Sequence, residues 1–470
     1  MKKYGIIAAI VAVGIAAFIG WKMFHGRGDA MASSLPKDIT AVSRLDAKQL
    51  ALDYGLSLED IRKLLLLDND KEMGVDLMTP AYLFTSQGTL GAIIPLSDKG
   101  DFCKMLETKG YAVEDQRGMK WCIINGNMLA GIAKDRAMIM GPAVGSEQEQ
   151  LRNVIYSCID QSESESGKNT LLYKNLEKRD EPLALATSLE ALPQTVLPSS
   201  LSRYLGDINL NDLGLSAGLM AKRDRVILNL TPNSENAKID KAINQFDDIL
   251  QPLDGSMLAA SPTNSILHLE IGLKGEKLLR ILRENKVIRT VLLMLNNVFD
   301  LDMILKSIDG ALAFSLPQID GDPVLQVKLS DDKFMQNVAS WNDAISRAAG
   351  FQFYAQDKHR AMLTYKGKPY YFSSNQDMLT ISSSEAIANS TGHHDIAYNF
   401  ADEIKGQRLY ASIDLSQFAK KYMNNSESAK MLKAFQRLTI SASNSKNLQL
   451  QLVLNDGENL LDLLDIESLK

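Results

Sequence analysis

The feature that most constrains this chain is an uncharged apolar run near its start. Eighteen consecutive residues from Tyr4 to Trp21 carry no charge, and lysines flank the run on both sides. Such a run is just long enough to cross a hydrocarbon core of about 30 Å as a helix. Aromatic residues at its ends suit the membrane–water interfaces, and the lysines can reach the lipid headgroups. The run therefore predicts a membrane anchor, whose anchoring residues are Tyr4, Ile6, Ile7, Ile10, Val11, Val13, Ile15, Phe18, Ile19 and Trp21.

A cleaved signal peptide is the alternative to a retained anchor. Ala30-Met31-Ala32 supplies an A-x-A pattern ahead of Ser33. Two cations, Lys22 and Arg27, separate the apolar run from that cleavage position, which favours retention. We expect residues 1–25 to be a signal anchor or a signal peptide. The rest of the protein then lies in the periplasm, anchored to the inner membrane, or is exported after signal cleavage at Ala32.

Past this segment, the composition is that of a soluble globular protein. A chain of 470 residues, at roughly 100 to 200 residues per domain, has room for two to four domains. The first 27 residues hold four basic residues and no acidic ones, so the remainder has 47 basic against 57 acidic residues, a net charge of -10. An acidic surface repels phosphate backbones, and no basic stripe with interleaved aromatic residues occurs. We therefore exclude nucleic acid as a partner.

Short strand-like runs and helix-like segments follow one another and predict an α+β fold. In the first part of the chain, the expected strands are 39–46, 80–86, 89–96, 121–124, 128–133 and 137–142, and the expected helices are 58–67, 98–110 and 146–159. Asn125-Gly126 between two apolar runs is a strong hairpin signal. Hairpin-length turns outnumber long crossover helices, so we expect largely antiparallel sheets.

The second half of the chain repeats the order of the first, which predicts an internal duplication. The matching segments are 183–192 with 409–418, 213–218 with 438–443, the strand and helix that begin at Ile39 with 265–279 and 286–299, and the hairpin around Gly126 with one at Lys366-Gly367-Lys368. The expected fold is therefore two similar lobes, each a mostly antiparallel sheet backed by helices, after an N-terminal transmembrane helix. The predicted divisions are a spacer over 26–38, a first lobe over 39–253 and a second, duplicated lobe over 254–470. A cleft between the lobes is the default ligand site.

The sequence gives weak support for a disulfide between its cysteines or for catalysis by its cysteines and histidines. The three cysteines are Cys103, Cys122 and Cys158, and the first two lie on neighbouring predicted elements. A disulfide between them and three buried free thiols are both open readings. No histidine lies in a recognisable nucleophile signature; the five are His25, His268, His359, His393 and His394.

Candidate metal and phosphate motifs are fragments. His393-His394-Asp395 places adjacent side chains on a loop, where they rarely point at one ion. Asp320-Gly321-Asp322 lacks the downstream glutamate of a calcium loop and is better explained as a tight turn. Residues 162–169 contain a Gly-Lys pair but lack the upstream glycine and the Ser/Thr after the lysine of a phosphate loop, so they predict an exposed acidic loop. From these fragments we expect no catalytic residue, cofactor or metal site.

Several phrases of the sequence resemble a known family. They are LPKDITAVSRLDAKQLALDYG from Leu35, GVDLMTPAYLFTS from Gly74, LGAIIPLSDKGDF from Leu90, and AMIMGP from Ala137. The likeness, over most of residues 35–470, is to exported proteins of Bacteroidota that are catalogued only as a domain of unknown function. It implies envelope attachment and brings no catalytic residues. Family members are usually lipoproteins or otherwise envelope-attached, whereas no cysteine precedes Cys103 here, so an acylated N-terminal cysteine is not expected.

Two functions follow from these observations. The first is a membrane-tethered, non-enzymatic cell-envelope protein that binds an unidentified protein, glycan or other envelope component. The alternative is an envelope hydrolase that uses carboxylates in the cleft between the lobes, because carboxylate chemistry leaves little trace in a sequence.

Overall fold

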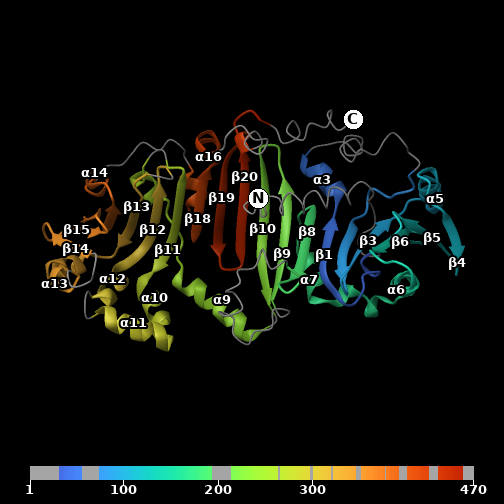
Figure 1. The fold of residues 1–470 in the computed structure, drawn as a ribbon, viewed down its shortest axis with the longest axis horizontal. Helices are drawn as coiled ribbons and strands as arrows, with labels where there is room; N and C mark the ends of the chain where they lie inside the picture. The colour runs from blue at the N-terminus through green and yellow to red at the C-terminus, as the bar shows by residue number, and fades with distance from the viewer. Residues whose placement is uncertain are drawn as a thin grey trace. The chain divides into compact units, whose positions relative to one another are not determined.

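The structure is a computed structural model. It describes residues 31–54, 73–192, 213–234, 236–262, 265–296, 300–318, 321–345, 351–375, 377–390, 400–422 and 432–458. Its strands belong to one 20-stranded sheet, and neighbouring strands within each unit pair antiparallel (Figure 1). Described residues up to Asn236 form a first compact unit, and those from Ala237 to Glu458 form a second. Each unit has its own set of strands and helices.

The first unit consists of a sheet with helices on both faces. Its elements are β1 (Ile39–Leu45), α3 (Ala47–Tyr54), β2 (Ala81–Ser86), β3 (Thr89–Pro95), α5 (Lys99–Thr108), β4 (Val113–Gln116), β5 (Met119–Ile124), β6 (Met128–Ile132), β7 (Arg136–Gly141), α6 (Ser146–Asp160), η1 (Glu163–Glu165), η2 (Gly167–Asn169), α7 (Leu171–Glu177), β8 (Leu183–Ser188), β9 (Leu213–Ala221) and β10 (Arg225–Ser234). Pairing places the strands in the order β10-β9-β8-β1-β2-β3-β7-β6-β5-β4.

The second unit uses the same plan. Its elements are α9 (Ala237–Ile249), η4 (Ser256–Ala260), β11 (Leu267–Lys274), α10 (Gly275–Glu284), α11 (Lys286–Asn296), α12 (Leu301–Ser307), β12 (Ile308–Leu316), β13 (Val324–Leu329), η5 (Lys333–Ser340), α13 (Trp341–Ile345), β14 (Phe351–Ala355), β15 (Arg360–Tyr365), β16 (Lys368–Ser374), β17 (Met378–Ser382), α14 (Glu385–Ala388), α15 (Ala401–Ile404), β18 (Leu409–Asp414), α16 (Leu415–Tyr422), β19 (Phe435–Asn444) and β20 (Asn447–Leu454). Pairing gives the order β20-β19-β18-β11-β12-β13-β17-β16-β15-β14.

The strand orders of the two units are identical once each label in the first is raised by ten. The segments that match in the sequence occupy equivalent strands, since those at 183 and 409 are β8 and β18, and those at 213 and 438 lie on β9 and β19. In each unit, the first strand therefore lies in the interior of the strand order, between the second strand and the eighth.

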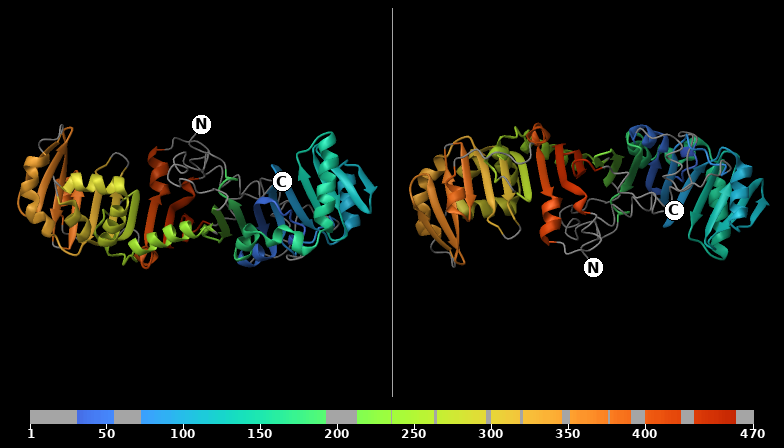
Figure 2. Two further views of the ribbon diagram at one scale, coloured as in Figure 1. Left: turned by 90° about the horizontal axis from the view of Figure 1, so that it is seen from below. Right: turned by 90° about the horizontal axis from the view of Figure 1, so that it is seen from above.

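The core of the first unit lies on both faces of its sheet. Successive residues of a strand point to opposite faces, so neighbours on β6 enter different clusters. Leu129 packs with Trp121 and α6, whereas Ala130 packs with Phe102 and Leu106 of α5. Figure 2 shows the helices of each unit lying against its strands in two views. Helices on both faces allow strands such as β7, which is buried from Ala137 onward, to be almost continuously apolar.

The prediction of two lobes with separate sheets is wrong, because all twenty strands belong to a single sheet. The strand pattern in a sequence shows where strands begin and end. It does not show where a sheet stops, because any strand has backbone groups on both sides that can pair with another strand. No helix in the described residues is long and apolar enough to cross a membrane. The predicted N-terminal transmembrane helix, within residues 1–25, lies outside those residues.

The structure differs from the sequence prediction at the end of the expected spacer. Met31, Ala32 and Leu35 are 0% exposed and belong to the main core cluster of the first unit. The side-chain amide of Gln161 donates to the carbonyl of Leu35 at 2.8 Å, and so does the backbone N–H of Gly167. The loop over 162–169, expected to be exposed, thus contributes buried backbone that holds this segment in place.

Candidate functional site

The most concentrated buried polar chemistry in the second unit lies on β11. His268 and Glu270 alternate with Leu267, Leu269 and Ile271, so they share one face of the strand. Both polar side chains are buried, while the three apolar neighbours are only partly buried. This alternation alone would place the histidine and glutamate toward solvent, which is the reverse of what the structure shows.

The register of the sheet extends this polar face across neighbouring strands. His268 lies opposite Ser412 of β18 and opposite Ser315 of β12, and Ser412 in turn lies opposite Thr439 of β19. All four side chains are buried. Directly opposite residues have adjacent side chains on the same face, so the four form one buried polar row.

His268 connects two members of this face by hydrogen bonds. Its Nδ1 lies 3.0 Å from Ser315 Oγ, and its Nε2 lies 2.8 Å from Glu270 Oε1. A serine, a histidine and a carboxylate in line are the groups of a nucleophilic triad. Here Ser315 is only 1% exposed, so no substrate carbonyl can reach its hydroxyl. The arrangement is therefore a structural hydrogen-bond chain.

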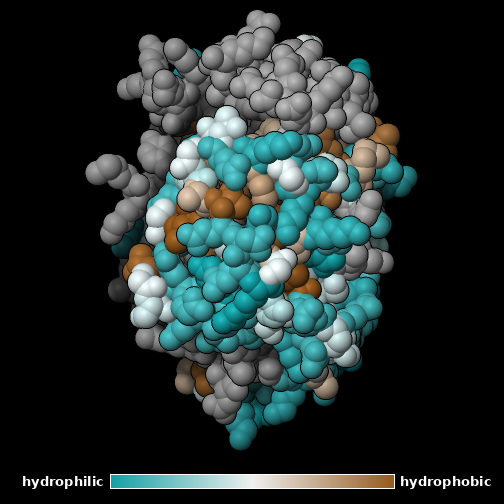
Figure 3. Space-filling model, turned by 90° about the vertical axis from the view of Figure 1, so that its right-hand side faces the viewer, coloured by the Kyte–Doolittle hydropathy of each residue, from teal (hydrophilic) through white to brown (hydrophobic). Residues whose placement is uncertain are grey.

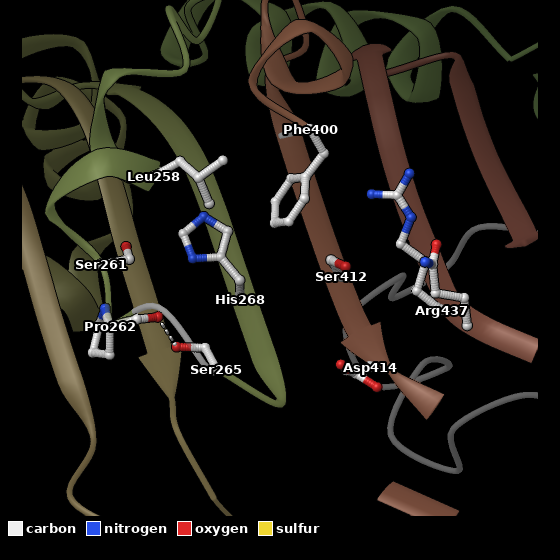
Figure 4. A pocket seen from close by; sticks show the side chains of 10 residues that line it. Leu258, Ser261, Pro262, Ser265, His268, Phe400, Ser412, Asp414 and Arg437 are labelled. Carbon is white, nitrogen blue, oxygen red and sulfur yellow. Dashed lines mark hydrogen bonds between the residues drawn. The ribbon is translucent and has the colours of Figure 1, made fainter. Parts of the chain in front are cut away.

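A small pocket opens beside this chain. Its lining residues are Leu258, Ser261, Pro262, Ser265, His268, Phe400, Ser412, Asp414, Gln436 and Arg437 (Figure 4). The volume of this cavity is about 40 Å³. A single water needs at least about 10 to 15 Å³ by the same measure. The pocket thus has room for a few waters and is too small for a sugar ring or a peptide.

An aromatic and ionic cluster forms one wall of the pocket. The ring of Phe400 meets His268 edge-on at 6.2 Å and carries the guanidinium of Arg437 at 5.4 Å from its centre. Arg437 donates to Glu403 at 2.6 Å, and the hydroxyl of Tyr410 donates to the other oxygen of Glu403 at 3.2 Å. Burial, assisted by Glu403, raises the pKa of Tyr410, so this hydroxyl remains a donor.

The acid of the pocket, Asp414, has a structural role. It is the residue before α16, and its Oδ1 accepts hydrogen bonds from the backbone N–H of Gln417 and from the hydroxyl of Ser416. The side-chain amide of Gln417 donates to the other carboxylate oxygen at 2.8 Å. A carboxylate that accepts from a backbone N–H in the first turn is a helix N-cap. Both oxygens of Asp414 are thus occupied by the start of α16.

The first unit has a buried polar cluster of its own. Glu181 Oε1 accepts from Asn229 at 2.8 Å and from Arg179 at 3.5 Å, and Arg179 also donates to Thr231 at 2.7 Å. A Cβ atom on Gly218 would lie 2.1 Å from the carboxyl carbon of Glu181. Because Gly218 has no side chain, the carboxyl group of Glu181 fits beside it. The hydrogen bonds of Glu181 hold the segment just before β8 in place.

The remaining candidates from the sequence are buried, structural or outside the described residues. Cys103, Cys122 and Cys158 are free and buried. Burial raises the pKa of Cys122 to about 11 and that of Cys158 to about 12, so neither is a ready nucleophile. Asp322 accepts a hydrogen bond from Ser383. Residues 393–395 and all ten anchor residues lie outside the described ranges, within which no group of three metal-binding side chains occurs.

A match to a family model identifies the family of this chain. The model described as "Domain of unknown function (DUF4836)" matches residues 37–444. The chain belongs to the DUF4836 family. This confirms the expected membership of a family whose function is unknown. No curated protein matches the sequence.

Solved structures give only a remote likeness to this DUF4836 protein. Structures of TP0453 in crystal forms IV, III and I match with TM-scores of 0.27, 0.27 and 0.26 and sequence identities of 13%, 11% and 12%. The matches cover 45%, 46% and 47% of this chain, and 82%, 86% and 86% of the other chains. Scores this low carry no argument about fold or function.

Sequence reasoning missed His268 and Glu270 as buried partners in this DUF4836 protein. The signal was their spacing of two within a strand, which puts both on one face. The spacing does not show which residues cover that face. Phe400, which lies more than a hundred residues after His268, contacts its ring and belongs to an apolar cluster with Leu253 and Met257.

Proposed function

We propose that this DUF4836 protein is a membrane-tethered, non-enzymatic component of the cell envelope. Residues 1–25 act as a retained anchor in the inner membrane, and the rest of the chain lies in the periplasm. There it binds an unidentified protein, glycan or other envelope component. The resemblance to exported proteins of Bacteroidota supports this location.

The observation that carries the tether is the burial of Met31 and Ala32. Signal cleavage at Ala32 would remove both residues from the core cluster that they share with Leu35 and Ile155. Loss of a fully buried methionine side chain alone costs about 2 to 5 kcal/mol of stability. A cut at this position would therefore weaken the protein that it releases, whereas a retained anchor leaves the core complete.

The pocket chemistry supports the non-enzymatic part of the proposal. The hydroxyl of Ser315 is inaccessible, Asp414 caps a helix, and Glu403 is paired with Arg437 and Tyr410. A hydrolase needs an accessible acid, base or nucleophile within reach of the scissile bond. The alternative of an envelope hydrolase with carboxylates between two lobes stays a prediction, and none of the contacts described in the second unit favours it.

The test is the N-terminus and location of the full-length protein carrying a C-terminal tag. We expect the intact mass to include residues 1–32, the protein to stay with membranes after a high-salt wash, and external protease to digest it once the outer membrane is opened. An Ala30→Leu control, which destroys the A-x-A pattern, should leave the mass and fractionation unchanged. A soluble protein that begins at Ser33 would overturn the tether.

The binding part of the proposal is tested by crosslinking in intact cells. The full-length protein should give a recurrent crosslinked envelope component that disappears when only residues 1–30 are fused to an unrelated periplasmic protein. Release of labelled monomers from purified envelope polymers by the purified protein would instead support the hydrolase.

A further inference from the structure

Helix α11 presents an unusual surface for a soluble protein. Only Leu292 of its eleven residues is buried, and Val287, Ile288, Val291, Leu293 and Met294 are exposed. At about 100° per residue, Val287, Val291 and Met294 fall within an arc of about 60°. They form an apolar stripe on the side of the helix that faces solvent.

The sequence builds α11 locally rather than through a large packed face. Asn285 separates it from α10, and the side-chain oxygen of Asn285 accepts from the backbone N–H groups of Val287 at 3.0 Å and Ile288 at 3.2 Å. This is the hydrogen bonding of a helix N-cap. A capped helix with one buried side chain keeps its shape while its apolar stripe remains available.

Charge distinguishes this segment from the rest of the chain. Residues 274–296, which comprise α10, α11 and the lysine before them, hold six basic and two acidic residues, a net charge of +4. The whole chain has a net charge of -6, so the remainder has -10. Lys286 and Arg289 are exposed on α11 itself. At about 100° per residue, Lys286 flanks the apolar stripe, whereas Arg289 lies on the other side of the helix. Arg283 of α10 pairs with Asp302.

The end of the first unit that Figure 3 shows has a different surface. Figure 3 shows the side of the first unit on which β4 and β5 lie, where hydrophilic residues cover most of the face and apolar ones form small scattered patches. Single exposed apolar residues are normal, but a continuous apolar stripe beside basic residues is typical of helices that lie in a membrane interface. In Figure 1, α11 lies with α10 and α12 at one border of the second unit.

We infer that α11, with the basic residues of 274–296, lies on the surface of an anionic lipid bilayer. The stripe of Val287, Val291 and Met294 enters the boundary between headgroups and acyl chains, while Lys286 beside it contacts the anionic headgroups. Arg289, on the other side of the helix, adds to the positive charge of the segment. An acidic protein partner offers the same charge complement, but lipid also accepts a flat apolar stripe without a matching groove. This contact goes beyond the proposed N-terminal anchor and does not depend on it.

The test uses the full-length protein in vesicles and a dye at one position of the stripe. Met294→Cys, at a site that is 64% exposed, is labelled with an environment-sensitive dye. Val144→Cys, at a 62% exposed site in the first unit, is the matched control. The three natural thiols are buried and stay unlabelled in the native protein. Vesicles contain phosphatidylcholine alone or with phosphatidylglycerol, and a lipid that carries a quencher in its acyl chain.

We expect the dye at residue 294 to be quenched at least threefold more than the dye at 144 in anionic vesicles. Quenching should fall to the control level in phosphatidylcholine vesicles and when Lys286→Glu and Arg289→Glu are combined. Equal quenching at the two sites, or equal quenching of 294 in both lipids, would overturn the inference. So would a spectral shift at 294 that grows with protein concentration without lipid, which indicates a second copy on the stripe. Flotation of the vesicles after a salt wash reports the N-terminal anchor separately.

Discussion

Replacement of Met31 by alanine tests whether the residues just before the first strand belong to the core. The side chain is 0% exposed and packs in the same cluster as Trp121 and Ile155. Truncation of a buried methionine to alanine removes its burial energy and leaves a cavity, which together cost about 2 to 5 kcal/mol. We expect a loss of about 3 kcal/mol in the free energy of unfolding of the first unit.

The cysteines provide an assay that reports only this unit. The chain has three, at Cys103, Cys122 and Cys158, and all are free, buried and in the first unit. Labelling with a thiol reagent during a urea titration therefore follows the unfolding of the first unit. With a urea dependence of about 2 to 3 kcal/mol per M, the midpoint should fall by about 1 to 1.5 M.

The control is Met78→Ala, because Met78 is 48% exposed. Its midpoint should stay within about 0.3 M of the wild type, as for most surface substitutions. A Met31→Ala midpoint no lower than that of the control would refute the packing of residue 31. Cleavage at Ala32 would then remove nothing from the core, and the main support for a retained anchor would be lost.

Three further tests concern two buried polar groups, at Gly218 and His268, and one exposed ion pair, at Asp254. Gly218→Ala should destabilise the first unit by about 2 kcal/mol in the thiol assay, through overpacking against a buried carboxyl group, whereas Gly214→Ala, whose nearest contact is at 3.5 Å, should be tolerated. His268→Ala leaves a buried carboxyl without its partner and should cost the second unit about 3 kcal/mol, measured by urea-dependent proteolysis with fragment mapping. Burial raises the pKa of Asp254, but hydrogen bonds, first that from Lys328, outweigh it and lower the pKa from 3.8 to about 2. Its contribution to stability is therefore complete above pH 3.8 and is lost toward pH 2, so Asp254→Asn should flatten the fall of the unfolding temperature over that range.

Local signals in the sequence predicted the turns well. Asn125-Gly126 joins β5 to β6, with φ values of 52° and 79°. Lys366 and Gly367 join β15 to β16 with 48° and 79°. Two consecutive residues with positive φ are what a tight hairpin turn with the right twist requires, and Asn and Gly adopt them at low cost. These turns depend only on the residues within them, which is why the sequence alone sufficed.

Which face of a strand is buried, and whether a loop segment joins the core, could not be predicted in the same way. His268 and Glu270 look solvent-facing on β11, yet Phe400, more than a hundred residues later, helps to cover them. Met31 precedes a polar, proline-containing stretch that reads as a spacer, but a loop near residue 167 fixes it in the core. In both places, burial is decided by residues that lie outside any local window of sequence.

The central position of the first strand in each unit has a consequence for biosynthesis. β1 pairs with β2 on one side and with β8 on the other, and β11 pairs with β12 and β18 in the same way. The late partner lies about 140 residues further along the chain in both units, and contacts this distant form slowly. Until β8 emerges, one edge of β1 remains unpaired and can pair with another chain. A nascent or translocating chain thus passes through two long intervals in which it depends on protection from aggregation, one for each unit.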